Sequence, residues 1–145
     1  MTPKEYFEKC RYLEDNIKEA QDEYDMLNAT LLAAVQHKQD MVTSTPTSGI
    51  EDKYIELSKR NNKINQAIDD KVDYTLKVSA ELDHMENNDY RRLLRDRYIV
   101  GKSWEQIAVD HRFDISWVYK LHGRALQEFE RMYPDKFGEQ AIKSH

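Results

Sequence analysis

The longest regular feature of this sequence is a stripe of apolar residues that recurs at alternating steps of four and three between residues 6 and 34. Its members are Tyr6, Cys10, Leu13, Ile17, Ala20, Tyr24, Leu27, Leu31 and Ala34. Such a repeat places the stripe along one side of an α-helix, as in coiled coils. Thr2 and Pro3 are suited to the N-cap and the first turn of that helix. A helix of about 36 residues is about 54 Å long and does not bury such a stripe by itself, so it needs a partner helix.

A second amphipathic stretch runs from about residue 50 to residue 86. Its mostly apolar stripe consists of Ile50, Tyr54, Leu57, Asn61, Ile64, Ile68, Val72, Thr75, Leu76, Ser79 and Leu82. Residues 41–49, which separate the two stretches, contain Pro46 and Gly49 and are predicted to be a flexible linker. We therefore expect residues 1–87 to form a helical arm in which the two helices fold into an antiparallel hairpin.

The length of both stripes leaves two arrangements open for this arm. In the first, the hairpin also self-associates, most simply as a homodimer. In the second, a lone hairpin buries both stripes. We assign self-association to apolar positions of both helices: Leu13, Ile17, Tyr24, Leu27, Leu31, Leu57, Ile64 and Ile68. Asn61 places an amide on the second stripe, where such a group usually selects the register or the number of partner helices.

Charge is distributed unevenly along the chain, whose formal net charge is −5. Both helical stretches of the arm are acidic, whereas residues 90–126 contain eight basic and four acidic side chains. An acidic arm joined to a basic head is one arrangement found in nucleic-acid-binding proteins. Four glycines and three prolines are too few for the many tight turns of an all-β protein, so we predict an all-α fold.

Residues 88–133 are predicted to form a helix-turn-helix domain. A first helix over residues 90–99 is expected to end at Gly101, because glycine suits the left-handed position after a helix. Ser103, followed three residues later by Gln106, has the pattern of a capping box. It predicts the start of a second, short helix.

Beyond a tight turn at residues 111–113, Asp114 is the expected N-cap of a third helix over residues 115–132. Its inward side chains are predicted to be Val118, Leu121, Ala125, Leu126 and Phe129. In a helix-turn-helix domain, the helix that directly follows the short one enters the major groove of DNA. Gly123 lies inside this helix, and we expect the close approach of another helix to explain it. Residues 134–145 are predicted to be a flexible tail.

The stretch from Ser103 to Leu126 resembles region four of bacterial sigma factors, a promoter-binding domain, and the correspondence has no gap. The positions that match are Glu105, Ile107, Ala108, Phe113, Asp114, Val118, Leu121, Ala125 and Leu126. The resemblance implies that the helix over residues 115–132 is the one that contacts base edges.

The whole chain is similar to a narrower group, the RinA- or ArpU-like late transcriptional regulators of Gram-positive phages and prophages. The likeness rests on Thr2-Pro-Lys-Glu-Tyr6 and on Arg97-Tyr-Ile-Val-Gly-Lys-Ser-Trp-Glu-Gln-Ile-Ala108. It implies a sequence-specific regulator of double-stranded DNA, an activator of late phage genes in the bacterial host. Two alternatives remain open: a packaging or assembly protein similar to small terminase subunits, and a protein that docks on host RNA polymerase.

Candidate DNA contacts fall into two groups. Base contacts are assigned to Ser116, Trp117, Tyr119 and Lys120, and backbone contacts to Arg91, Arg92, Arg95, Lys102, Arg112 and Arg124. Arg124 alternatively pairs with Glu128, one turn further along the helix. Sigma factors carry several Arg, Glu and Gln residues on the equivalent face. The difference leaves three expectations open: modest affinity, contacts of Trp and Tyr with thymine methyl groups, or a module that contacts protein instead.

The patterns of enzymes and metal sites are missing from this sequence. Cys10, the single cysteine, lies on the heptad stripe, and the five histidines show no metal-binding spacing. The four glycines are scattered and form no phosphate-binding loop. We therefore predict no enzyme, no cofactor and no metal. No apolar run approaches the about 20 residues of a membrane span, and no signal peptide is recognisable, so we expect a cytoplasmic protein without a membrane partner.

Overall fold

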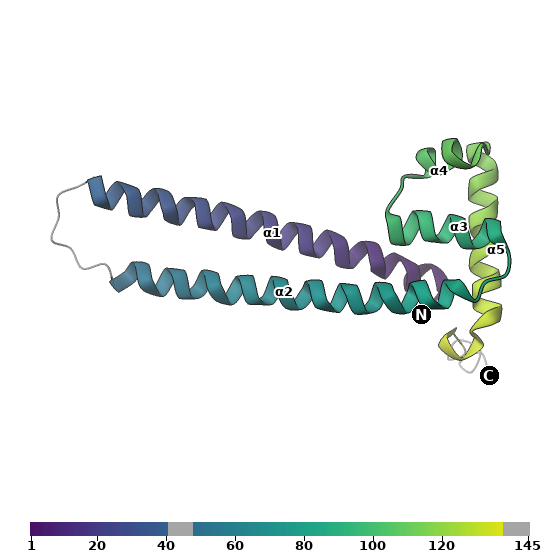
Figure 1. Cartoon of the computed structure of the whole chain (residues 1–145), viewed down its shortest axis with the longest axis horizontal. Helices are drawn as coiled ribbons and strands as arrows, with labels where there is room; N and C mark the ends of the chain where they lie inside the picture. The colour runs from purple at the N-terminus through teal and green to yellow at the C-terminus, as the bar shows by residue number, and fades with distance from the viewer. Residues whose placement is uncertain (41–47, 138–145) are drawn as a thin grey trace. The chain divides into compact units, whose positions relative to one another are not determined.

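The computed structural model describes residues 1–40 and 48–137, and this part of the chain is all-α, with no strand (Figure 1). Its helices are α1 (Pro3–Asp40), α2 (Ser48–Asp83), α3 (Asn88–Leu94), the π-helix η1 (Arg95–Val100), α4 (Trp104–His111) and α5 (Ile115–Met132). None of the described helices is both long enough and apolar enough to cross a membrane. The predicted all-α fold is therefore confirmed.

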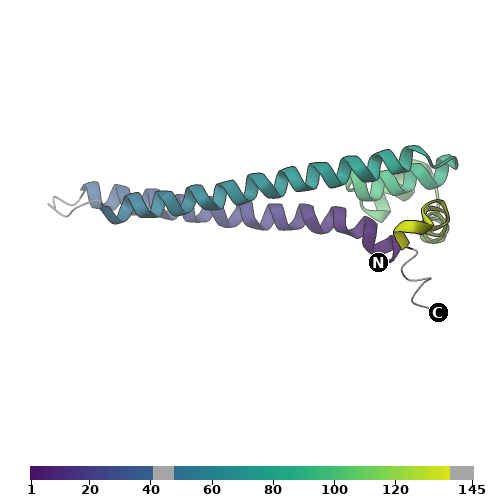
Figure 2. The same cartoon turned by 90° about the horizontal axis from the view of Figure 1, so that it is seen from below.

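The chain divides into two compact units. We call residues 13–71 the hairpin unit, and residues 1–12 together with the described residues from 72 onward the head unit. The helices α1 and α2 contribute to both units, and Figures 1 and 2 show them side by side and antiparallel. The predicted antiparallel pair is thus present.

The ends of α1 and α2 follow local chemistry. The Thr2 hydroxyl accepts a hydrogen bond from the Glu5 backbone N–H at 3.1 Å, as expected of an N-cap. The predicted linker over residues 41–49 is too long at its C-terminal end, because α2 already begins at Ser48. Residues 41–47 lie outside the described part of the chain.

The hairpin unit has a small apolar core. Leu31, Ile50 and Leu57 form its buried cluster, and Tyr24 and Val35 pack against them. Ile64 of α2 is also buried in this unit, while the other apolar side chains of its two helices are half-buried or exposed. Two ion pairs also join the helices of this unit, Arg60 with Glu23 and Lys71 with Glu14.

The buried side of α1 departs from the predicted stripe near its C-terminal end. Leu27 is 39% exposed and Ala34 is exposed, whereas Asn28 and Val35 are half-buried. A straight α-helix drifts by about 20° per heptad relative to a strict seven-residue repeat, so the inward positions move on by one residue. Within a single copy, Leu27 and Ala34 of the predicted stripe therefore do not lie on the buried side of α1.

The head unit has a much larger core, and its aromatic rings come from distant parts of the chain. Phe7 of α1 lies with its ring centroid 4.7 Å from that of Phe129 of α5 and 5.2 Å from that of Tyr98 of η1. Leu82 and Met85, at and beyond the end of α2, are also buried in this cluster. The helix α3 crosses α5 (Figure 1), and its Leu93 and Leu94 belong to the same cluster.

The predicted boundary between arm and head at residue 88 therefore differs from the packing. Residues 1–12 and 72–87 belong to the same compact unit as α3, α4 and α5. The apolar stripes continue through both units without a break, so the sequence pattern does not reveal where one stripe changes its packing partner.

The predicted flexible tail begins too early. Residues 134–137 form a helical turn, and Phe137 is buried with its ring 5.7 Å from that of Tyr6. Lys136 forms an ion pair with Glu81 of α2. This segment is therefore part of the head core, while residues 138–145 lie outside the described residues.

The helix predicted over residues 90–99 is divided into α3 and η1. Its last turn is wide, and the Asp96 carbonyl accepts hydrogen bonds from the backbone N–H groups of Gly101 and Lys102 at 3.0 and 2.9 Å. Gly101 has a φ of 91°, which confirms the left-handed position predicted for it. The π-helical turn itself has no signal in the sequence.

Candidate nucleic-acid interface

The start of α4 is set by the predicted cap. The Ser103 hydroxyl accepts a hydrogen bond from the Gln106 backbone N–H at 3.1 Å. The Gln106 side chain does not complete the capping box, because it donates to Asp110 Oδ1 at 2.7 Å instead. The helix therefore begins at Trp104, where the sequence predicted it.

The turn between α4 and α5 is tight. Arg112 adopts a left-handed conformation with a φ of 58°, and the Phe113 backbone N–H donates to the Ala108 carbonyl at 2.9 Å. Asp114 occupies the N-cap position of α5, but its side chain makes no capping hydrogen bond. The turn thus joins the two helices as in a helix-turn-helix domain.

Burial of one side of α5 determines which side faces outward. Val118, Leu121, Ala125 and Phe129 are buried, while Leu126 is half-buried. Ser116, Lys120 and Gln127 are exposed on the opposite side. Their spacing of four and seven residues places them in one row along the helix. We call this row, together with Gly123, the polar strip of α5.

Aromatic residues flank the polar strip. Trp117 is 36% exposed, and the guanidinium of Arg124 lies 5.1 Å from its ring centroid. Tyr119 is 51% exposed and packs edge-on against Trp104 of α4, with their centroids 5.8 Å apart. Because successive residues of a helix are about 100° apart, Trp117 and Tyr119 lie on opposite sides of the strip.

The predicted pairing of Arg124 with Glu128 is not present. Glu128 pairs with Arg131 at 2.9 Å, and Arg124 stacks on Trp117 instead. Arg97 makes a similar contact, with its guanidinium 4.3 Å from the ring centroid of Trp104. Neither contact between an arginine and a tryptophan was predicted from the sequence.

Neither the conformation nor the packing of the described residues requires a glycine at position 123. It lies in the interior of α5, where glycine costs about 1 kcal/mol relative to alanine. A Cβ atom built there would meet no heavy atom within 4 Å among the described residues, apart from its own helix. The expected close approach of another helix is therefore wrong.

Apart from Arg124, which stacks on Trp117, the arginines and lysines predicted to contact either the bases or the backbone of DNA divide into two sets. Arg92, Arg112 and Lys120 are exposed, and within the described residues their side chains form no hydrogen bond or ion pair. Arg91, Arg95 and Lys102 are engaged within the protein. The two sets differ in their surroundings, although the sequence around Arg91 and Arg92 does not distinguish them.

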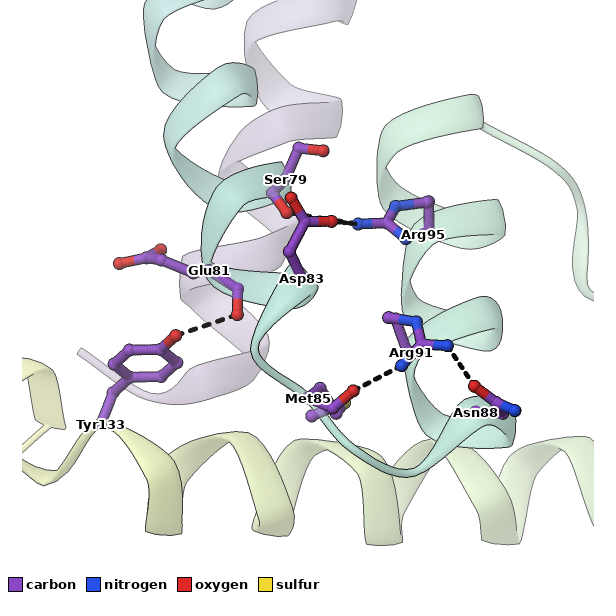
Figure 3. A network of polar contacts seen from close by, with 8 residues as sticks. All are labelled: Ser79, Glu81, Asp83, Met85, Asn88, Arg91, Arg95 and Tyr133. Atoms are coloured by element: carbon purple, nitrogen blue, oxygen red, sulfur yellow. Dashed lines mark hydrogen bonds and ion pairs between the residues drawn. The ribbon is translucent and has the colours of Figure 1, made fainter.

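Arg91 and Arg95 hold the corner between α2 and α3 (Figure 3). The Arg91 guanidinium donates to the Met85 carbonyl at 2.6 Å and also to the Asn88 side chain. The Arg95 guanidinium donates to Asp83 Oδ1 at 2.7 Å and to the Ser79 carbonyl at 3.2 Å.

These contacts reach the Ser79 carbonyl near the end of α2 and the Met85 carbonyl just beyond it, so the two arginines tie α3 and η1 to the chain segment that follows α2. The same corner is closed from α5, where the Tyr133 hydroxyl donates to the Glu81 carbonyl at 2.9 Å (Figure 3). Removing either arginine would therefore disturb the fold before it reported on DNA.

Lys102 bridges two carboxylates, with its Nζ 2.9 Å from Asp110 Oδ2 and 3.6 Å from Asp96 Oδ2. The hydrogen bond to Asp110 raises the pKa of Lys102 and lowers the pKa of Asp110. Its positive charge is therefore matched within the protein.

Two histidines are inside the head unit and face different partners. The Tyr98 hydroxyl lies 2.7 Å from His122 Nε2, and burial, together with the charges of Lys4 and Arg97, lowers the pKa of His122 to about 4. His111 Nε2 lies 2.8 Å from Asp96 Oδ2.

Within the described ranges, no group of three or more His, Cys, Asp or Glu side chains is arranged to hold a metal ion.

The residues assigned to self-association lie at different depths. Leu31, Leu57 and Ile64 are buried, Leu13, Ile17 and Tyr24 are half-buried, and Leu27 and Ile68 are 39% and 38% exposed. An open groove of about 720 Å³ runs between α1 and α2 within the hairpin unit. Leu27, Leu31, Ala34 and Leu57 supply its apolar lining.

The rim of this groove carries charges of both signs. Asp52, Glu56, Lys53 and Arg60 all line it. The groove therefore has an apolar floor and a mixed charged border.

Comparison with known proteins places the chain in one family. Proteins of the DUF1492 family, which are described as of unknown function, match residues 31–130. The match extends over α2, α3, η1 and α4 and nearly all of α5. No curated protein and no solved structure matches the chain significantly. Because the match covers more than half of the sequence, this chain belongs to the DUF1492 family of proteins of unknown function.

Proposed function

We propose that this protein is a transcriptional regulator that binds double-stranded DNA with α5 in the major groove. The observation that carries the proposal is the polar strip of α5, which has unpaired cations at and beside it and stands on a helix-turn-helix frame. A helix-turn-helix domain presents the N-terminal residues of its second helix to base edges, and Ser116 and Lys120 lie in the first two turns of α5. The resemblance to phage late regulators gives the biological setting, the activation of late genes.

Side chains of the polar strip have the chemistry for base contacts. Lys120 suits guanine O6 and N7, and Gln127 suits adenine N6 and N7. Ser116 suits either kind of base edge. Trp117 and Tyr119, on the flanks, offer apolar surface to thymine methyl groups.

Backbone contacts are proposed for the cations that remain unpaired. Arg92 and Arg112 are exposed and lie outside the polar strip, and Arg124 stands at its edge. Neutralising three or four phosphates gives a slope of log affinity against log salt of about −3 to −4. Arg91, Arg95 and Lys102 are not part of this set, because their charges and donors are used inside the protein.

Self-association is proposed for the hairpin unit, with a second copy of this chain in its groove. Leu27 and Ala34 of the groove are exposed in a single copy, whereas Leu31 and Leu57 are buried beneath them. A two-fold interface brings the same surface of both copies together, so it requires a self-complementary rim. Lys53 on one copy would then face Asp52 on the other. Arg60 and Glu56 also line the groove, but they pair with Glu23 and Lys59 within each copy.

The proposal is tested by selection of duplexes from a randomised DNA pool, followed by binding measurements across a salt series. An enriched sequence and a slope of about −3 to −4 support it. Failure to bind any duplex at low salt contradicts it.

A second candidate function is docking on a protein such as host RNA polymerase. It is favoured by the apolar surface on α5, where Ile115, Trp117 and Tyr119 are exposed. If the chain co-sediments with purified RNA polymerase and binds no duplex DNA, docking on the polymerase becomes the better-supported function.

A further inference from the structure

We infer that Gly123 is the point at which the backbone of α5 comes into direct contact with DNA. This inference rests on the proposed function. Gly123 is the one position of the polar strip without a side chain, so its backbone is directly accessible. Ser116, Lys120 and Gln127 lie on the same side of the helix as Gly123.

Conformation does not explain the glycine. Among the described residues, only Gly101 and Arg112 have a positive φ, so Gly123 adopts an ordinary helical conformation open to any residue except proline. Alanine at this position would favour the helix. The helix therefore forms in spite of Gly123.

Packing within the chain does not explain it either. The space that a Cβ atom would occupy is open, and the position is exposed. Glycine is the residue that allows close approach to a backbone. With both internal reasons removed, the remaining role of the glycine is toward a partner outside the chain.

The surroundings of Gly123 favour DNA as that partner. Lys120 precedes it by three residues and is unpaired, and Arg124 follows it with its guanidinium on Trp117. The other members of the polar strip are Ser116 and Gln127, and the nearest exposed carboxylate on this side of α5 is Glu130, two turns beyond Gly123. A bare backbone between two cations matches a negatively charged surface in close contact, which is what the wall of the major groove offers.

The test compares Gly123→Ala with Gly49→Ala. Gly49 is the comparison glycine outside the head unit, because it is exposed in the first turn of α2 and a Cβ atom there meets no atom of the described residues within 4 Å. Gly49 also lines the groove of the hairpin unit, so it serves as a control only if Gly49→Ala leaves self-association unchanged. Both substitutions should raise the melting temperature, by about 3 °C for Gly123→Ala and by less for Gly49→Ala at the helix end. The mass in solution is measured for both variants to verify that self-association is unchanged.

DNA affinity should separate the two variants. On a duplex selected by the wild-type chain, Gly123→Ala should weaken binding by about tenfold, because a methyl group is inserted into a packed contact, and Gly123→Leu should weaken it further. Gly49→Ala should bind as the wild type does. A Gly123→Ala variant that is more stable and binds DNA with unchanged affinity would overturn the inference.

Failure of the inference is distinguishable from failure of the proposed function. If Lys120→Ala weakens binding to the selected duplex and Gly123→Ala does not, then α5 contacts DNA but the inference about Gly123 is wrong. If the wild-type chain binds no duplex, the proposed function is wrong and the inference falls with it.

Discussion

The head unit and the hairpin unit are built from the same two long helices, yet they bury very different cores. In the head unit, Phe7 and Leu82 pack on a cluster that includes Phe129 of α5. In the hairpin unit, the buried cluster is limited to Leu31, Ile50 and Leu57. A repeating apolar stripe thus determines which side of a helix is buried. How much that side contributes to the free energy of unfolding depends on the segments that pack against it.

Ion pairs do not compensate for this difference. Arg60 and Glu23 of the hairpin unit are both more than half exposed, and such pairs contribute about 0–1 kcal/mol. In the head unit, by contrast, His111 Nε2 lies 2.8 Å from Asp96 Oδ2, and the His111 side chain is only 1% exposed, so water screens this contact much less. The hairpin unit therefore needs apolar contact with a further surface more than the head unit does, which is the reason for placing self-association there.

The largest expected effect separates the two cores directly. Phe129→Ala should lower the free energy of unfolding by about 3–5 kcal/mol, because its ring is fully buried among other aromatic rings. Leu57→Ala, the matched change in the hairpin unit, should cost about 2 kcal/mol because its surroundings are less complete. Urea unfolding followed by circular dichroism measures both. Equal losses would show that the two cores are equivalent.

The next effect concerns association through the groove. Leu27→Asp should weaken self-association about a hundredfold, since it would place a charge on the apolar floor of the interface. Met26→Asp is the control, because Met26 is the neighbouring residue, is highly exposed and does not line the groove. Sedimentation of both variants and of the wild type provides the measurement. A wild-type chain that remains monomeric at high micromolar concentration contradicts the proposal.

A pH dependence should arise in the head unit alone. The pKa of His122 is about 4 in the folded state, below the ordinary value of 6.5. The unfolded chain therefore binds the proton more readily, so this residue contributes stability above pH 6.5 and loses it as the pH falls toward 4. Between pH 7 and pH 5 the loss should be about 1–2 kcal/mol, because solvent screens a group that is only partly buried.

The pH prediction is tested by thermal and urea unfolding at several pH values. His122→Gln should remove this part of the dependence, and His37→Gln, in the exposed part of α1, should leave it unchanged. A wild-type profile that matches that of His122→Gln would show that His122 is not responsible.

Base contact in the head unit predicts a difference between sequences. Tyr119→Ala or Lys120→Ala should cost about 1–3 kcal/mol on a selected duplex and little on random DNA. Lys18→Ala, an exposed lysine of the hairpin unit, should change neither affinity. Fluorescence anisotropy with both duplexes measures the effect. Proportional losses on both duplexes would show that α5 does not recognise sequence.

The smallest effect distinguishes free from engaged cations. Arg112→Ala should reduce the salt slope by about 1, because its guanidinium has no partner among the residues that the structure describes. Lys102→Ala should leave the slope nearly unchanged, because its ammonium group already lies 2.9 Å from Asp110. Both slopes are measured in the same salt series. An identical change of slope in both variants would contradict the division of the cations into unpaired and engaged sets.

Local sequence signals determined most of the helix boundaries and the outward side of α5. The caps at Thr2 and Ser103 and the left-handed Gly101 depend only on neighbouring residues, so they were predictable. The inward positions Val118 and Leu121 follow from helical periodicity, and the position of the polar strip follows from them. Helical periodicity alone therefore accounts for the exposure of the candidate base contacts on α5.

Only the tertiary structure decided which surfaces each segment meets. Periodicity reports which side of a helix is apolar but carries no information about its partner, so the inclusion of Phe7 and Phe137 in the head core was not predictable. The long arginine side chains have several partners within reach, and the corner after α2 engages Arg91 while it leaves Arg92 free. The open space at Gly123 was likewise decided by the packing of distant segments, because a neighbour there would have come from another part of the chain.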